Sequence, residues 1–361
     1  MIEHKINVEL RLGANRTEAR IACADRSQVY GLFQGLHHSR VGEHVKRVYN
    51  VCSEAQQLAA QRAVHSALGL ANNAQADATQ SARAKLECLR EQLLHIARCW
   101  GRLIDEPEAM HSFAPLYRVL ANACASDKPQ LDTCQQEKIA HWLFDKSASQ
   151  WSQQTDSLTA LRRWCDNHNT LAAHSIGWTL DTELAGIGQS ELRRLNTNDL
   201  PEIANRLRRA DSTGFCQAPR HQNSCLDNSI CQPIAHPLLQ AVEHRYGHGL
   251  LWRQLHRLLA LARSLQSGEP THTAAALEDL PVGTAAVATA RGWLVHAIEF
   301  EDEHVSRFRA LAPTEWNFHC DGLAKRCLER LDLRHPTPVE KQARAVIDAI
   351  DPCMGYSLRV H

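Results

Sequence analysis

The sequence predicts an α+β fold that is mainly α, with a helical core and small β-hairpins near both ends of the chain. Two observations predict this class. Apolar and polar residues alternate near the N-terminus and again over residues 291–311, as they do in half-buried strands. Between residues 53 and 266, apolar residues recur at the helical period instead. Because no repeat or low-complexity segment divides the chain, we expect one domain over residues 1–361.

The first predicted element is a β-hairpin within residues 1–25. Residues 4–11, HKINVELR, and residues 17–24, TEARIACA, alternate apolar and polar positions on either side of the sequence GAN. Two alternating stretches around a short turn are typical of a hairpin.

The predicted helical core covers residues 53–266. The predicted helical stretches are joined by connections that contain Asn, Asp, Ser and Pro. These stretches are residues 54–69, 80–103, 107–125, 135–147, 154–173 and 198–209. Residues 212–236 are rich in turn-forming residues and predict a loop. A further helix is expected over residues 237–265. Gly247 and Gly249 are its weak point, since a glycine costs about 1 kcal/mol in a helix interior.

A second β-hairpin is predicted within residues 289–312, where RGWLVHAIE and HVSRFRAL flank FEDE. The last element, over residues 337–361, is a helix followed by a tail that contains Cys353. We expect Thr337 to be its N-cap, Pro338 its first residue and Glu340 the partner in a capping box. The apolar positions of one helix face are Val339, Ala343, Val346, Ile347 and Ile350.

Charge and composition exclude several classes of partner. Lys plus Arg and Asp plus Glu number 40 each, so nothing indicates binding to nucleic acid or to an anionic membrane. Charged residues interrupt the N-terminal MIEHKINVELRLG, and no apolar run reaches about 18 residues. We expect a cytoplasmic protein that does not insert into membranes.

The chain has 13 cysteines, which we expect to be thiols in a reducing compartment. Cys52 precedes a predicted helix, whose dipole favours the metal-binding thiolate. Cys353 follows Pro352, which ends a helix and stiffens the approach to the sulfur. Each cysteine alone is more often a small buried side chain than a ligand.

Two other groups could bind metal. The predicted loop contains Cys216, His221, Cys225 and Cys231, but the spacing C-x8-C-x5-C matches no common metal signature. His244 and His248 are four residues apart in the predicted helix, without an obvious third ligand. For both groups a structural or surface role is the favoured interpretation.

The two terminal cysteine segments together resemble the nickel–iron hydrogenase large subunits. That family has R-x-C-G-x-C-x-x-x-H near its N-terminus and D-P-C-x-x-C-x-x-H near its C-terminus. This sequence has RVYNVCSEAQ at residues 47–56 and DPCMGYSLR at residues 351–359. Other segments match in the same order: IEHKINVEL, STGFCQAPRHQN, YGHGLLWRQLHRLLALA, ARGWLVH and APTEWN. The resemblance covers nearly the whole chain and implies the fold of that family.

The sequence departs from this family at the metal ligands. Where the family has four cysteines, this chain has Tyr49, Cys52, Cys353 and Tyr356. A phenol replaces a soft thiolate poorly, so we expect neither nickel nor a complete nickel–iron site. His37 and Gln56 replace a proton-transfer acid and a histidine of the family. The C-terminal peptide that the family removes by proteolysis has no counterpart, so no cleavage is expected.

The remaining pattern is similar to the HupK/HoxV-type accessory proteins, which resemble truncated hydrogenase large subunits. The resemblance implies a noncatalytic scaffold without catalytic residues, which holds or assembles an Fe(CN)2CO unit transiently. Cys52 and Cys353 would bind the iron, while Arg291 and Thr314 would donate hydrogen bonds to its cyanides. The implied partners are maturation proteins of the HypC/HypD type and the precursor of a hydrogenase large subunit.

Alternatives remain open. The chain could be a remodelled hydrogenase or hydrogen sensor, or a metal-free chaperone that docks maturation factors. Arg291 could form an ordinary surface ion pair, and Thr314 could serve a turn. Tyr49 and Tyr356 could fill the space of the missing thiolates or bind metal weakly.

Overall fold

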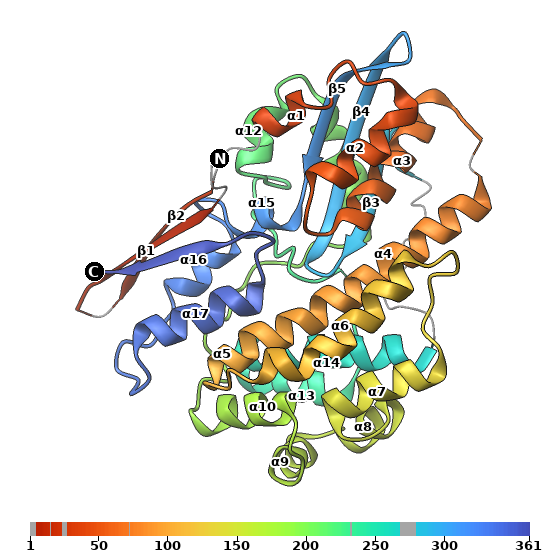
Figure 1. Cartoon of the computed structure of the whole chain (residues 1–361). Helices are drawn as coiled ribbons and strands as arrows, with labels where there is room; N and C mark the ends of the chain where they lie inside the picture. The colour runs from red at the N-terminus through yellow and green to blue at the C-terminus, as the bar shows by residue number, and fades with distance from the viewer. Residues whose placement is uncertain (1–4, 15, 24–26, 72, 232, 268–278) are drawn as a thin grey trace.

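The computed structural model describes residues 5–14, 16–23, 27–71, 73–231, 233–267 and 279–361. It confirms a mainly helical α+β fold with two small sheets (Figure 1). One sheet contains both the first and the last strand of the chain, and the second sheet lies among helices. A group of longer helices forms the rest of the molecule.

The terminal sheet has the strand order β2-β1-β6. As the sequence predicts, β1 (Ile6–Leu12) and β2 (Thr17–Ala22) form an antiparallel hairpin. The tail that follows Cys353 is not an irregular segment, because it forms strand β6 (Tyr356–Val360), parallel to β1. Sequence analysis missed β6 because it is short and its partner lies at the other end of the chain.

The second sheet has the order β3-β4-β5, so the predicted hairpin over residues 289–312 is incomplete. Strands β4 (Gly292–Glu301) and β5 (His304–Leu311) pair as expected, and β3 (Thr284–Thr289) adds a third strand. Every residue of β3 is buried, so it lacks the alternation that identifies a half-exposed strand.

Helices cover both faces of the second sheet. α2 (His38–Val48) and α3 (Ser53–Leu68) pack against one face, where their apolar residues share a cluster with Ile298 of β4 and Phe308 of β5. α11 (Leu200–Arg208) packs against the other face. α1 (Ser27–Gly31) and α2 precede residue 53, so the helical part of the chain begins before the predicted core.

The longer helices share one large apolar core. They are α4 (Ala74–His95), α6 (Ala109–Ala125), α7 (Thr133–Phe144), α8 (Ala148–Gln154), α9 (Leu158–Asn167), α10 (Leu171–Asp181), α13 (Pro237–Tyr246) and α14 (Leu250–Ser267). A π-helical turn (Ile96–Trp100) joins α4 to the short α5 (Gly101–Leu103), whose Leu103 belongs to a second apolar cluster. The predicted helix over residues 154–173 is two helices, because Ser157 and Thr170 each cap a new N-terminus. Gly247 separates α13 from α14, as expected.

The remaining helices complete the fold. They are a 3₁₀ turn (Thr197–Asp199), α12 (Ser212–Gln217), α15 (Pro313–Asn317), α16 (Leu323–Leu328) and α17 (Val339–Ile350). α12 lies inside the predicted loop. The predicted capping box of α17 is wrong, because Pro338 occupies the N-cap position without a side-chain cap. Gln342 instead donates to the carbonyl of Thr337. Four of the five predicted apolar positions of α17 are buried, and Val339, in the first turn, is partly buried.

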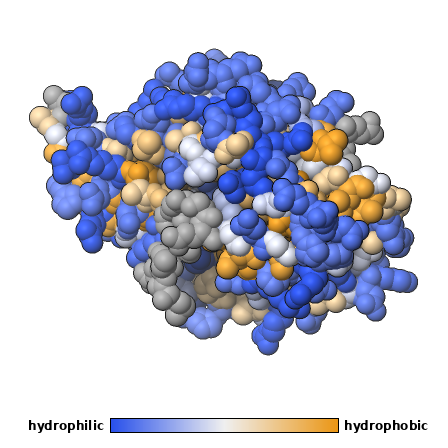
Figure 2. Space-filling model, turned by 90° about the horizontal axis from the view of Figure 1, so that it is seen from above, coloured by the Kyte–Doolittle hydropathy of each residue, from blue (hydrophilic) through white to orange (hydrophobic). Residues whose placement is uncertain are grey.

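One face of the molecule is mostly polar. On the face seen from above in Figure 2, hydrophilic residues predominate and hydrophobic residues lie in small separate groups. Among the residues that the structure describes, no helix has both the length and the apolar character needed to span a bilayer.

Candidate functional site

Three of the four predicted site residues line one cavity of about 260 Å³, and the fourth lies against it. Cys52, Arg291 and Cys353 are in the lining. Thr314 is bonded to Cys353 at the same place. These residues come from the N-terminus of α3, the β3–β4 turn, α15 and the segment after α17. The fold therefore brings the predicted ligands together from opposite ends of the chain.

Cys52 is 8% exposed and occupies the N-cap position of α3 in a left-handed conformation, with φ 56°. The N-terminal amides of α3 do not point to its sulfur. The carboxylate of Glu87 accepts hydrogen bonds from the N–H groups of Glu54 and Ala55 at 3.0–3.1 Å. Burial raises the pKa of the Cys52 thiol well above its ordinary value, although nearby Arg291 lowers it. The expectation that the helix favours a thiolate here is thus wrong for the metal-free protein.

Arg291 is 6% exposed, so it does not form an ordinary surface ion pair. Its Nη1 donates to the Cys52 sulfur at 3.4 Å. Its Nε donates to Asp351 Oδ1 at 3.2 Å, and Nη2 donates to Glu91 Oε2 at 3.4 Å. Burial alone would lower the pKa of Arg291, but Asp351 raises it above its ordinary value. A permanent cation therefore faces the cavity, with its position fixed by two buried carboxylates.

Asp351 anchors this charged group from the C-terminus of α17. Its carboxylate also lies 3.3 Å from Arg257 Nη2 and 3.2 Å from His95 Nδ1. Burial would raise the pKa of Asp351, but Arg291 and His95 hold it well below its usual range. Sequence analysis did not select Asp351 as a site residue, although it begins the segment DPC.

Cys353 is held by two hydrogen bonds to Thr314. The Thr314 hydroxyl donates to the Cys353 sulfur at 3.0 Å and accepts from the Cys353 N–H at 3.1 Å. Thr314 is 1% exposed, so its rotamer is fixed by packing. Both of these hydrogen bonds join α15 to the segment after α17, so the hydroxyl contacts the sulfur and its backbone.

No protein-family model matches the sequence. The hydrogenase expression/formation protein HupK of Azotobacter vinelandii is 26% identical over 361 residues, covering 99% of this chain and 98% of that protein. The hydrogenase expression/formation protein HoxV of Cupriavidus necator is 24% identical over 374 residues, covering 91% of this chain and 90% of that protein. The chain is similar to the HupK and HoxV proteins over nearly its whole length.

The chain also has the fold of the nickel–iron hydrogenase large subunit. The nickel–iron–selenium hydrogenase of Desulfovibrio vulgaris Hildenborough matches it with a TM-score of 0.59. The match covers 95% of each chain at 13% identity. At this identity the likeness establishes a shared fold.

Tyr49 and Tyr356 have different surroundings. Tyr49 lines the cavity, and its ring stacks against Phe33 at a centroid distance of 6.3 Å. Tyr356 is outside the described lining, and its hydroxyl donates to Asp348 at 2.8 Å. Burial raises the pKa of Tyr356, so its phenol stays protonated. Of the two, Tyr49 shares the cavity lining with the cysteines and Tyr356 does not, whereas the sequence allowed both to fill the space of the missing thiolates.

Gln56 also lines the cavity, and its side-chain oxygen lies 2.7 Å from Nε2 of the buried His296. Burial lowers the pKa of His296 to about 3, so this ring is neutral and can donate its Nε2 proton to Gln56. Sequence analysis did not identify His296.

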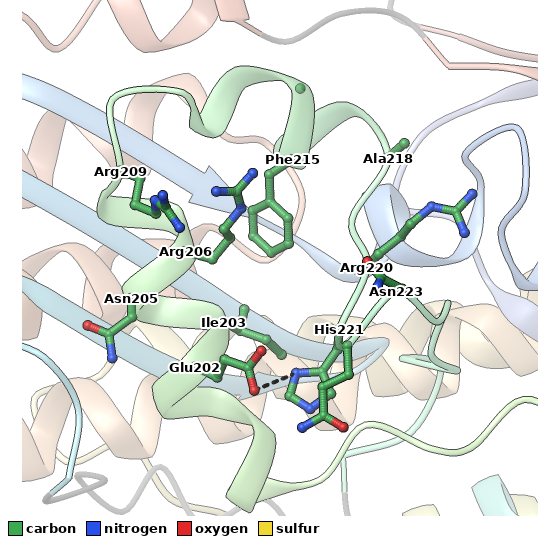
Figure 3. Close-up of a pocket in the computed structure, with 12 residues that line it drawn as sticks. Glu202, Ile203, Asn205, Arg206, Arg209, Phe215, Ala218, Arg220, His221 and Asn223 are labelled. Carbon is green, nitrogen blue, oxygen red and sulfur yellow. Dashed lines mark ion pairs between the residues drawn. The ribbon is translucent and has the colours of Figure 1, made fainter.

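The loop cysteines do not assemble a metal site among the described residues. Cys231 donates to the carbonyl of Thr289. His221 borders a separate cavity of about 580 Å³ and points toward Glu202, with 3.5 Å between Nδ1 and Oε2 (Figure 3). His244 and His248 lie on either side of the break after α13, so they do not share a helix face.

Proposed function

We propose that this protein is a noncatalytic scaffold in the maturation of a nickel–iron hydrogenase. It transiently holds or assembles the Fe(CN)2CO unit and passes it to the hydrogenase large subunit. The similarity to proteins named for hydrogenase expression and formation supports the maturation role. The convergence of Cys52, Arg291, Thr314 and Cys353 on one cavity supports the iron-holding role.

The residues fit an iron unit of this kind. The cavity of about 260 Å³ far exceeds the ~10–15 Å³ needed for one water molecule. Two sulfurs are suitable ligands for a low-spin iron once they lose their protons on binding. Arg291 offers an N–H at 3.4 Å from the Cys52 sulfur, where an anionic cyanide could accept it. The Thr314 hydroxyl, at 3.0 Å from the Cys353 sulfur, could donate to a second ligand.

We propose that the site takes no nickel. Tyr49 stands beside the sulfurs, while the Tyr356 hydroxyl is engaged by Asp348. Two thiolates hold a metal less firmly than four, which suits a unit that must be passed on. Transfer needs partners, and we propose maturation proteins of the HypC/HypD type and a large-subunit precursor in the cytoplasm.

The test is a double variant, Cys52→Ala with Cys353→Ala, produced with the complete maturation machinery. We expect the purified variant to lose its iron and the host to accumulate immature hydrogenase. The matched control is Cys320→Ala, because Cys320 is exposed and lies outside the cavity lining.

Two outcomes would redirect the proposal. Normal hydrogenase maturation by the double variant would favour a metal-free docking chaperone. Stoichiometric nickel in the purified parent protein would favour a remodelled hydrogenase or hydrogen sensor.

A further inference from the structure

A second group of potential ligands lies where α2 begins, beside the turn between β4 and β5. One nitrogen of His37, one nitrogen of His38 and one carboxylate oxygen of Glu303 all lie within 4.8 Å of one another. His37 Nε2 is 3.6 Å from Glu303 Oε2. Among the described residues, this is the one group of three or more such side chains with that mutual proximity. It is distinct from the cysteine cavity, whose lining contains none of the three.

The backbone holds these side chains together, although they are far apart in sequence. The N–H of His38 donates to the carbonyl of Glu303 at 3.0 Å. His37 and His304 form an isolated antiparallel bridge. Beside it, the Val305 N–H donates to Leu36 at 2.9 Å. The relative position of the two ligand segments is therefore fixed by main-chain bonds before any ion binds.

The ring of His37 has a partner that suits it to bind metal. Its Nδ1 lies 2.9 Å from the Ser39 hydroxyl. In the structure Nδ1 also accepts the Ser39 N–H at 3.4 Å, so an ion binding at Nε2 requires the ring proton to move to Nδ1. Nδ1 then donates to the Ser39 hydroxyl, and the lone pair of Nε2 is available on the side of Glu303. Metal-binding histidines commonly use the second nitrogen in this way. The His37 and His38 rings are 4.2 Å apart, so they can face one ion.

We propose that His37, His38 and Glu303 bind one divalent first-row transition-metal ion, such as Zn²⁺. Two imidazoles and one carboxylate form a known ligand set for zinc. The nitrogen ligands favour zinc or nickel over magnesium and calcium, which take oxygen ligands. The side chains of His37 and Glu303 are 39% and 69% exposed, so an ion can reach them from solvent.

The ion would join the β4–β5 turn to α2. Tyr49, which follows the last residue of α2, lines the cysteine cavity. The site therefore lies at the opposite end of a helix that borders the proposed iron site.

The experiment is calorimetric titration of Zn²⁺ into the metal-free Cys52→Ser, Cys353→Ser variant, in which the cavity sulfurs are absent. We expect one Zn²⁺ per chain. Loss of an outer hydrogen-bond partner of a metal ligand weakens metal binding roughly 10–100-fold. Loss of a ligand itself should cost at least as much, so we expect His38→Ala and Glu303→Gln each to weaken Zn²⁺ binding at least ~100-fold. The control is His111→Ala, since His111 forms an exposed pair with Glu108 at 3.0 Å and lacks a third ligand.

A second measurement avoids the cysteine substitutions. Co²⁺ added to the otherwise unmodified chain should give an absorption spectrum with a component that lacks thiolate charge-transfer bands. We expect His38→Ala to remove this component and His111→Ala to retain it. The proposal is overturned if Zn²⁺ does not bind stoichiometrically. It is also overturned if His38→Ala and Glu303→Gln, with unchanged thermal unfolding of the metal-free protein, bind Zn²⁺ as tightly as the parent.

Discussion

Thr314 determines the position of the Cys353 sulfur, because its hydroxyl contacts both the sulfur and the amide of that residue. A β-branched side chain that is 1% exposed has little freedom to turn away. The same hydroxyl is the donor that the proposed function assigns to a ligand of the iron. Substitutions at Thr314 can therefore separate the effect of side-chain shape on stability from the effect of the hydroxyl's hydrogen bonds.

We predict that Thr314→Val lowers the free energy of unfolding by about 1–3 kcal/mol, because the Cys353 N–H loses its acceptor. Thr314→Ser keeps the hydroxyl and should retain the hydrogen bonds. Denaturant unfolding of the metal-free proteins measures both effects. Equal stability of the valine variant and the parent would show that the two hydrogen bonds make no net contribution to the free energy of unfolding.

Tyr356 tests whether both tyrosines belong to the metal site. Tyr356→Phe removes a hydrogen bond to the Asp348 carboxylate, so we predict a loss of about 1–3 kcal/mol in unfolding free energy. Because the hydroxyl is directed to Asp348, we also predict unchanged iron content in protein produced with the maturation machinery. Loss of iron together with normal folding would instead assign Tyr356 to the site.

The connection between α15 and α16 contains a buried histidine, His319, which is 3% exposed. The N–H of Asp321 donates to its Nδ1 at 3.2 Å. Burial lowers the pKa of His319 from 6.5 to about 4, and the nearby Arg220 adds to the effect. This connection directly follows α15, the helix that contains Thr314.

We predict that the protein loses stability as the pH falls from about 6.5 toward 4. Over this range the unfolded chain binds a proton at His319 while the folded chain does not, so protonation favours unfolding. The contribution is at most about 3 kcal/mol. His319→Asn keeps an acceptor near the Nδ1 position and does not titrate, so unfolding measured against pH should show a shallower slope for it. An identical slope would contradict this assignment.

Strand β6 and helix α17 together fix the segment that contains Cys353. Asp351 ends α17 in a left-handed conformation, with φ 64°. Tyr356 then pairs with Ile6 at the start of the parallel ladder. Cys353 lies between these two anchors, so the first strand of the chain helps to position a residue near its end.

The sequence could identify the four residues that meet at the cavity because they occur in short segments with a characteristic order. It could not identify Glu91, Arg257 or His95. These residues occur within helices, where charged side chains usually face solvent, and only tertiary packing turns them toward Asp351 and Arg291. A similar limit applies to β6, whose partner β1 lies at the other end of the chain, and to β3, whose complete burial removes the alternating pattern.

The whole chain has the fold of a hydrogenase large subunit, with two cysteines and two tyrosines in its terminal segments. The central claim is that this altered site holds an iron unit with cyanide and carbonyl ligands. Infrared spectroscopy of the protein, purified anaerobically after production with the maturation machinery, tests that claim most directly. The account predicts cyanide and carbonyl stretching bands that Cys320→Ala retains and that Cys52→Ala with Cys353→Ala abolishes. Absence of these bands from the parent protein, or their persistence in the double variant, would contradict it.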